Sequence, residues 1–397
     1  MAADISFFGL RGRPTLIRAL DAVFRNGPLA RRQLRAAVGA SASTTTEAVQ
    51  ELLARGLIVE TDTTASTGGR PAKLLDLSPT LGIVLAADIG AMNVRVGAGS
   101  LRGKILARRT IATPAVADAE VLQQTLAEAM HGVQAEAGGG SVRALVVGLA
   151  AIVDALAESV SYVTVPGWRE AGSTNLIAWL RTQFNGYPLV LENEANLAAL
   201  GEYRYGSASG SNNMMFVAVG AGVGAGLVVN GSLFRGHGGA AGEIGLMRLC
   251  SGAAAVELDR LAGAEALLRR YREAGGAPVG DAESVFARAA SGDAAARAVI
   301  SSVIGDLAVG IANAINLFAP EKVVIGGGLA DAGAIVLEPL RNQIQHFVAQ
   351  TPEIVASSLG SDAALVGGLY LASEQAREAI GAELDGGRTR PFAAPVL

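Results

Sequence analysis

Acidic groups, amides and glycines gather in residues 191–245. The segment 191–196 reads Leu-Glu-Asn-Glu-Ala-Asn, glycines recur from 220 to 226, and Gly-Glu-Ile-Gly occupies 242–245. Sugar hydroxyls need donors and acceptors held in fixed directions, and a site built to hydrogen-bond a hydroxyl rejects analogues that lack it. The pattern therefore predicts a pocket for a polyol.

Glycine turns that follow apolar strands are the second chemical feature. The segments 84–89, 215–219 and 323–325 each run into glycine. Backbone N–H groups at such turns can approach phosphates, although a single glycine turn is at least as often purely structural. The candidate residues of these turns are Asp88, Gly90, Gly220, Gly222, Gly326 and Gly327.

Strands and helices alternate from residue 82 onward, which is typical of α/β layering. We expect strands at 83–89, 94–99, 104–111 and 144–149 and a helix at 119–137. Two long apolar helices, expected at 295–318 and 365–379, favour a core between two lobes rather than a partner surface.

The first eighty residues predict a different module. Amphipathic periodicity indicates helices at 14–26, 30–38 and 41–55, and Ser41 is a good N-cap for the third. Two short strands then flank a polar tip at 61–69, as in a β-hairpin. This order is typical of a winged helix-turn-helix, whose last helix enters the DNA major groove.

Charge supports that interpretation weakly. Residues 1–80 carry ten basic and seven acidic side chains, whereas the whole chain has a net charge of −4. Phosphate contacts supply most non-specific DNA affinity. The alternative is a protein-binding domain whose Ser and Thr residues only cap and solvate a surface helix. The candidate DNA contacts are Arg31, Arg32, Arg35, Ser41, Ser43, Thr44, Thr46, Glu47, Gln50, Arg70 and Lys73.

Composition sets the remaining bounds. The 397 residues are half apolar, enough for two or three folded domains. We expect no membrane span and a cytoplasmic protein, because long unbroken apolar stretches and a signal peptide are missing. The single cysteine, Cys250, excludes an internal disulfide and a multi-thiolate zinc site. Residues 386–397 are expected to be flexible.

The motifs together resemble the ROK family (repressors, open reading frames and kinases), in its NagC- and XylR-like regulator branch. The resemblance extends from about Pro14 to Ala376. Its motifs are Gly-Gly-Arg-Pro-Ala at 68–72, Asp88-Ile89-Gly90, Pro166-Gly167-Trp168, 192–196, 220–226, 242–245 and 325–328.

The resemblance implies an N-terminal winged helix-turn-helix, mostly α with a β-hairpin wing, followed by a two-lobed α/β fold of the actin-like ATPase and sugar-kinase type. The domains expected are 1–80 for DNA binding, 81–200 and 201–380 for the two lobes, and 381–397 for a tail.

The chain departs from ROK kinases where phosphoryl transfer would occur. Glu194 stands where the kinases carry an aspartate base, and a base must lie within about 3 Å of the proton that it takes. The kinase turn Asp-Ile-Gly-Gly-Thr-Lys continues here as Ala91-Met92-Asn93, and Ala221 replaces a threonine. We therefore expect no ATP as cofactor and no enzymatic activity.

The chain also departs from the ROK pattern at the zinc site that typical members carry. Leu246 stands at the position of its histidine, and Cys250 alone remains of its cysteine cluster. One thiol cannot anchor a tetrahedral zinc site, so we expect no metal. Cys250 is then expected to be a small buried or half-buried residue.

Motif positions imply four sugar contacts. For Asn193 and Glu243 the alternative is a cap or a loop-fixing hydrogen bond, and for Glu257 it is a solvated helix carboxylate. Glu194 can still accept a hydrogen bond from a sugar hydroxyl. The implied sugar-binding residues are Asn193, Glu194, Glu243 and Glu257.

The favoured hypothesis is a sugar-responsive transcriptional regulator, a repressor of carbohydrate uptake or catabolism genes. Its partners would be a double-stranded DNA operator with an inverted repeat, a sugar or sugar-derived effector, and a second copy in a homodimer or higher oligomer. One alternative is an active ATP-dependent ROK sugar kinase with an added DNA-binding domain. The other is a scaffold that binds no DNA.

Overall fold

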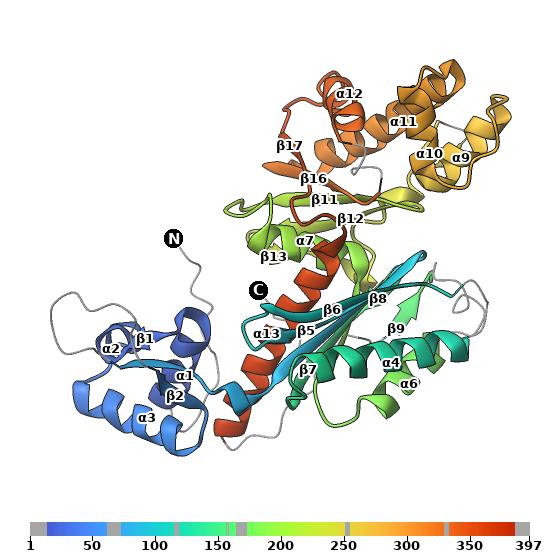
Figure 1. Ribbon diagram of the computed structural model, residues 1–397. Helices are drawn as coiled ribbons and strands as arrows, with labels where there is room; N and C mark the ends of the chain where they lie inside the picture. Colours follow the sequence, from blue (N-terminus) through green and yellow to red (C-terminus); the bar gives the residue numbers. More distant parts are fainter. Residues whose placement is uncertain are drawn as a thin grey trace.

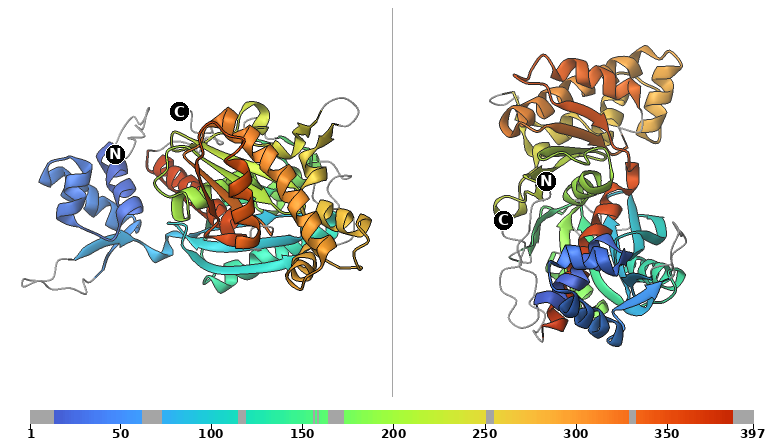
Figure 2. Two further views of the ribbon diagram at one scale, coloured as in Figure 1. Left: turned by 90° about the horizontal axis from the view of Figure 1, so that it is seen from above. Right: turned by 90° about the vertical axis from the view of Figure 1, so that its left-hand side faces the viewer.

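An N-terminal head and a two-lobed body make up the protein (Figure 1). The computed structural model describes residues 14–61, 73–114, 119–155, 157, 159–163, 173–250, 255–328 and 333–385. The polar tip with Arg70, the Pro166-Gly167-Trp168 motif and the tail 386–397 lie outside the described residues. Figure 2 shows the head standing apart at one end of the body.

Three helices and a small sheet form the head. Gly39 ends the second helix with a φ of +66°, a left-handed conformation that favours glycine, and so separates that helix from the third. The three predicted helices are confirmed, and the predicted hairpin gains a third strand, because the order in the sheet is β1-β3-β2. The elements are α1 (Pro14–Asn26), β1 (Leu29–Ala30), α2 (Arg31–Val38), α3 (Ala42–Ala54), β2 (Ile58–Thr61) and β3 (Leu74–Leu77).

The first lobe is a five-stranded sheet of order β10-β7-β4-β5-β6. β4, β7 and β10 are parallel, and β5 and β6 extend the sheet antiparallel. The short turn η1 (Pro79–Leu81) joins it to the head. Its elements are β4 (Ile83–Ile89), β5 (Asn93–Ser100), β6 (Ile105–Ala112), α4 (Ala119–Glu136), β7 (Val142–Leu149), β8 (Ile152–Asp154), β9 (Ser159–Ser161), α6 (Ser173–Gln183), β10 (Leu189–Asn193) and α7 (Glu194–Tyr205).

The second lobe repeats this plan with a sheet of order β13-β12-β11-β16-β17. The apolar core of this lobe surrounds α11 (Ala294–Phe318). The length and composition of this helix would suit a membrane span, but 61% of its most apolar stretch is buried inside the structure. The elements are β11 (Met214–Val219), β12 (Val223–Val229), β13 (Ser232–Leu233), η2 (His237–Gly239), η3 (Ile244–Leu246), β14 (Arg248–Leu249), β15 (Val256–Glu257), α8 (Leu258–Leu261), α9 (Ala264–Glu273), α10 (Ala282–Ala290), α11 (Ala294–Phe318), β16 (Lys322–Gly326), α12 (Ala334–Ile344), β17 (Glu353–Ala356) and η6 (Gly360–Asp362).

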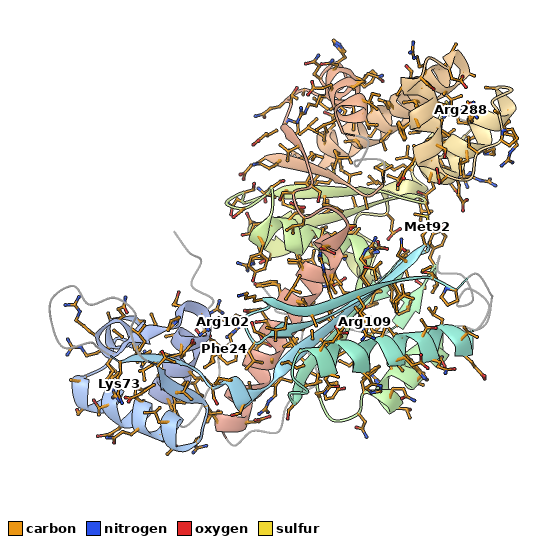
Figure 3. All side chains as sticks on the ribbon, in the orientation of Figure 1. Phe24, Lys73, Met92, Arg102, Arg109 and Arg288 are labelled. Carbon is orange, nitrogen blue, oxygen red and sulfur yellow. The ribbon has the colours of Figure 1, made fainter. Side chains whose placement is uncertain are left out.

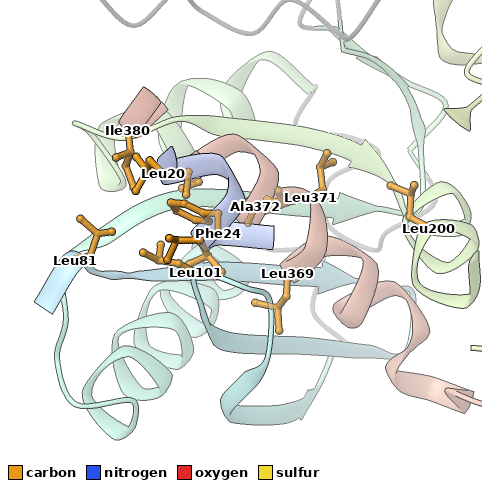
Figure 4. Close-up of a cluster of buried hydrophobic side chains, with 14 of the residues drawn as sticks. Leu20, Phe24, Leu81, Leu101, Leu200, Leu369, Leu371, Ala372 and Ile380 are labelled. Carbon is orange, nitrogen blue, oxygen red and sulfur yellow. The ribbon is translucent and has the colours of Figure 1, made fainter. Parts of the chain in front are cut away.

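The last helix, α13 (Ala363–Leu384), packs against β4, β7 and α7 of the first lobe. Its predicted assignment to the second lobe is therefore wrong. Close approach explains the packing, because a Cβ at Gly201 would lie 2.4 Å from the Ala363 carbonyl oxygen. Figure 4 shows Leu20 and Phe24 of α1 in the same apolar cluster as Ala372 and Ile380 of α13.

Candidate functional site

A cleft of about 1260 Å³ opens between the lobes. The carboxyl ends of β4 and β10 meet there with the end of β11, which is the usual place for a ligand in open α/β sheets. All three glycine turns reach it, but Gly326 does not line it and lies under the Phe216 ring. Figure 3 shows Met92, whose side chain is exposed, at the opening of this cleft.

The Asn193 amide is already engaged within the protein. Its Oδ1 accepts a hydrogen bond from the Asn196 N–H at 3.1 Å and so caps α7, and its Nδ2 donates to the Ala151 carbonyl at 2.9 Å. The capping role considered in the sequence is therefore present. Asn193 lines the cleft, and any ligand contact would use an amide that is already held in one orientation.

Glu192 fixes the segment 192–196 through hydrogen bonds made inside the protein. Its carboxylate is fully buried, accepts from Arg235 Nε at 2.7 Å, and accepts from the Asn193 N–H and from Asn196 Nδ2, each at 2.9 Å. Both carboxylate oxygens thus have hydrogen-bond partners, and a buried charge is stable only when it is paired in this way. Glu192 and Arg235 are positioning residues for the strand end that carries Asn193.

Two carboxyl groups and one guanidinium occupy the corner beside the first glycine turn. Arg95 lies 3.3 Å from Asp88 Oδ2, and Asp88 Oδ1 is buried without a hydrogen-bond partner among the described residues. A Cβ at Gly90 would lie 3.6 Å from Glu194 Oε2, so the longer side chain reaches this turn. Burial raises the pKa of Asp88 well above its usual range, and it raises the pKa of Glu194.

Glu243 and Asp259 form the acidic wall of the second lobe. Asp259 Oδ1 accepts from the Val223 N–H at 2.6 Å and so fixes the second glycine turn. Burial, and then the charge of Asp259, raises the pKa of Glu243. Within the described part of the chain the Glu243 carboxyl has no hydrogen-bond partner, so it is available to a ligand.

Two residues lie away from their predicted places. Glu257 does not line the cleft and pairs with Arg248 at 3.1 Å. Cys250 is exposed, with a φ of +71°, so its predicted burial is wrong. Among the described residues, no three His, Cys, Asp or Glu side chains are grouped to hold a metal ion.

The head presents α2 and α3 on its surface. Arg32 and Arg35 are exposed on α2, and no described residue pairs with them. Arg31 and Lys73 instead pair with Glu60, each at 2.8 Å, which lowers the pKa of Glu60. Ser41 Oγ accepts from the Thr44 N–H at 3.2 Å as the cap of α3, and Thr46 Oγ1 donates to the Ala42 carbonyl. The remaining candidates on α3 are Ser43, Glu47 and Gln50, all exposed.

The body matches the model of the ROK family over residues 84–375. This chain is a member of the ROK family. The two-lobed sugar-kinase fold expected from the motifs is thereby confirmed.

Curated relatives of this ROK protein include both kinases and repressors. It is 28% identical over 324 residues to a glucokinase of Streptomyces coelicolor, covering 74% of this chain and 98% of the relative. It is 25% identical over 353 residues to the xylose repressor of Caldicellulosiruptor bescii, covering 83% and 88%.

A solved structure extends the likeness in fold. A ROK family transcriptional regulator, a homologue of the E. coli MLC protein, superimposes with a TM-score of 0.74 at 23% identity and covers 94% of this chain and 98% of its own. The superposition must include part of the head, because it covers 94% of the chain and residues 81–397 alone make up about four-fifths of it.

Sequence reasoning missed three charged residues of this ROK protein's cleft and its support, namely Arg95, Arg235 and Asp259, and it gave Glu192 no role beyond its motif. Arg95 could have been found from the hairpin, because it is the cross-strand partner of Asp88. Arg235 and Asp259 act across long sequence separations, and no local pattern marks such pairs.

Proposed function

We propose that this ROK protein is a sugar-responsive, DNA-binding transcriptional regulator that represses genes of carbohydrate uptake or catabolism. The observation that carries the proposal is a head of winged helix-turn-helix order joined to a ROK cleft whose first glycine turn continues as Ala91, Met92 and Asn93. A homodimer would present two copies of α3 to an inverted repeat.

The residues of the first glycine turn argue against catalysis. A kinase needs positive charge and open backbone N–H groups around the transferred phosphate. Here the first turn offers Ala91, Met92 and Asn93 in place of glycine, threonine and lysine, and the Glu194 carboxyl reaches toward Gly90. The first turn therefore lacks the hydroxyl group and the cation that would stabilise a transferred phosphate.

A continuous packed path supports coupling between cleft and head. α7 begins at Glu194 in the cleft and packs along α13. α13 in turn contacts α1, where Arg377 pairs with Asp21 at 2.7 Å. Arg102 closes the junction, because it donates to the Val23 and Phe24 carbonyls and pairs with Asp76 at 2.6 Å. A ligand that prefers one arrangement of the lobes would therefore bias the head.

DNA binding by the full chain, with and without sugars, tests the proposal. Fragments from upstream of sugar-uptake genes should be retained, and at least one sugar should alter retention. Glu243→Gln should abolish the sugar effect by removing a charge-assisted acceptor, about tenfold or more in sugar affinity. Glu257→Gln is the matched control outside the cleft and should respond like the wild type. Retention that no sugar alters would reject the effector half of the proposal.

The kinase alternative is favoured by one observation, the likeness to a glucokinase over nearly the whole of that relative. A coupled ADP-release assay over a panel of hexoses separates the two functions. The proposal predicts no sugar-dependent ADP release, and sustained turnover would replace it with the kinase function.

A further inference from the structure

The outward face of α3 is narrow and chemically simple. Thr45, Ala48, Val49 and Leu52 are buried against the head, which leaves one solvent-facing stripe. Figure 1 shows α3 at the outer edge of the head, away from both lobes. The exposed residues that follow one another along this stripe are Ser43, Thr46, Glu47, Gln50 and Ala54.

The hydroxyl groups at the start of α3 are occupied locally. Ser43 Oγ and Thr44 Oγ1 hydrogen-bond Ser41 Oγ at 2.9 and 2.8 Å, and Thr46 Oγ1 donates to the Ala42 carbonyl at 2.8 Å. Glu51 stands beside the stripe and pairs with Arg55 at 2.6 Å. Hydroxyls held in this way serve the cap and the helix backbone first.

Glu47 and Gln50 are therefore the side chains on this stripe with both length and free polar atoms. Neither forms a side-chain hydrogen bond or an ion pair within the described residues, and both are exposed. The stripe carries no lysine or arginine, whereas α2 carries Arg31, Arg32 and Arg35. Phosphate contacts and base contacts are thus assigned to different helices.

The two side chains suit different bases. In a bidentate pair with adenine, the glutamine amide nitrogen donates to N7 and the amide oxygen accepts from the N6 amino group. A carboxylate accepts from the N4 amino group of cytosine. Guanine is usually read by arginine or lysine, which this stripe lacks. Three residues of helix rise about 4.5 Å, close to the roughly 3.4 Å between successive base pairs, so the two side chains can reach neighbouring pairs.

We propose that Glu47 and Gln50 determine the operator sequence by reading adjacent base pairs of each half-site, a cytosine by Glu47 and an adenine by Gln50. The inference rests on the proposed DNA-binding function and adds the identity of the bases. The bidentate contact of Gln50 with adenine discriminates against other bases by about fivefold to more than 100-fold.

Selection from a randomised duplex library by the full-length protein tests the proposal. The wild type should enrich half-sites with a C·G pair next to an A·T pair. Gln50→Ala should lose the preference at the A·T pair alone, about fivefold or more, and Glu47→Gln should exchange cytosine for adenine at the other pair. Glu51→Gln makes the same chemical change beside the stripe and should keep the wild-type sequence.

Two results would count against the inference in different ways. If the wild type enriches a defined half-site but Gln50→Ala and Glu47→Gln select the same half-site, other residues read the bases and the inference is overturned. If the wild type enriches no duplex at all, the DNA-binding function itself fails, and the inference fails with it.

Discussion

Asp88 and Glu194 place two carboxyl groups in a buried corner of the cleft, and Arg95 supplies a guanidinium beside Asp88. Removal from water disfavours the charged form of a carboxyl group, and a neighbouring carboxylate disfavours it further. Both effects act on Asp88, and the Arg95 charge offsets them in part.

The raised pKa values predict how stability depends on pH. A carboxyl group whose pKa is higher in the folded state binds more protons when folded, so its contribution is present at acid pH and is lost as pH rises through the folded-state pKa. Asp88→Asn removes the largest part of this effect. Urea unfolding at pH 5 and pH 8 should show a smaller loss of stability with pH in Asp88→Asn than in the wild type.

If Asp88→Asn loses as much unfolding free energy between the two pH values as the wild type, ionisation of Asp88 does not destabilise the folded state, and the prediction is wrong.

At the scale of elements, Glu60 of β2 connects α2 of the head to the hairpin. It pairs with Arg31 of α2 and with Lys73, which precedes β3. Both cations were predicted to contact DNA, and each is partly neutralised in the free head. Glu60 therefore limits the positive charge that the head presents. Under the proposed DNA-binding function, this would favour sequence-dependent over non-specific binding.

Glu60→Gln should strengthen non-specific binding. The change releases up to two cations per head for phosphate contacts, which would steepen the slope of log affinity against log salt by up to about 1.8 per head. Fluorescence anisotropy with a labelled duplex of arbitrary sequence, measured over a series of salt concentrations, gives this slope. Glu51→Gln is the control on α3, and an unchanged slope in Glu60→Gln would mean that Arg31 and Lys73 stay away from DNA.

Local patterns predict most of the elements, because periodicity and capping act over a few residues. Ser41 and the buried stripe of α3 define that helix, and the apolar run 83–89 defines β4. The positions that local patterns miss depend on distant partners. Arg235 pairs with Glu192, which lies 43 residues earlier in the sequence. α13 packs on the first lobe although the whole second lobe separates the two in the sequence.

At the scale of the whole molecule, α13 is the element that touches both the cleft-bearing helix and the head. Arg377 is the main charged contact at its head end, because its buried guanidinium pairs with Asp21 at 2.7 Å and with Glu374 at 2.8 Å. The apolar cluster of Figure 4 continues across the same junction. The head is thus held by packing and by charge rather than by a linker alone.

Arg377→Ala should loosen the head without unfolding the body. Loss of hydrogen bonds between charged groups costs about 1–3 kcal/mol, so amide exchange in α1 should accelerate by about fivefold to 150-fold. Hydrogen–deuterium exchange read on α1 measures this. Arg269→Ala removes an exposed pair of the second lobe and should leave α1 unchanged. Equal α1 exchange in the wild type and Arg377→Ala would place the junction's stability elsewhere.

The central claim is that occupancy of the cleft changes how the head binds DNA. The most direct measurement is the dissociation constant of the full-length protein for its selected duplex, determined by anisotropy across a concentration series of each sugar in a panel. The account predicts that at least one sugar shifts this constant by about fivefold to 150-fold and that Glu243→Gln removes the shift. A dissociation constant that stays the same at saturating concentrations of a sugar shown by calorimetry to occupy the cleft would contradict it.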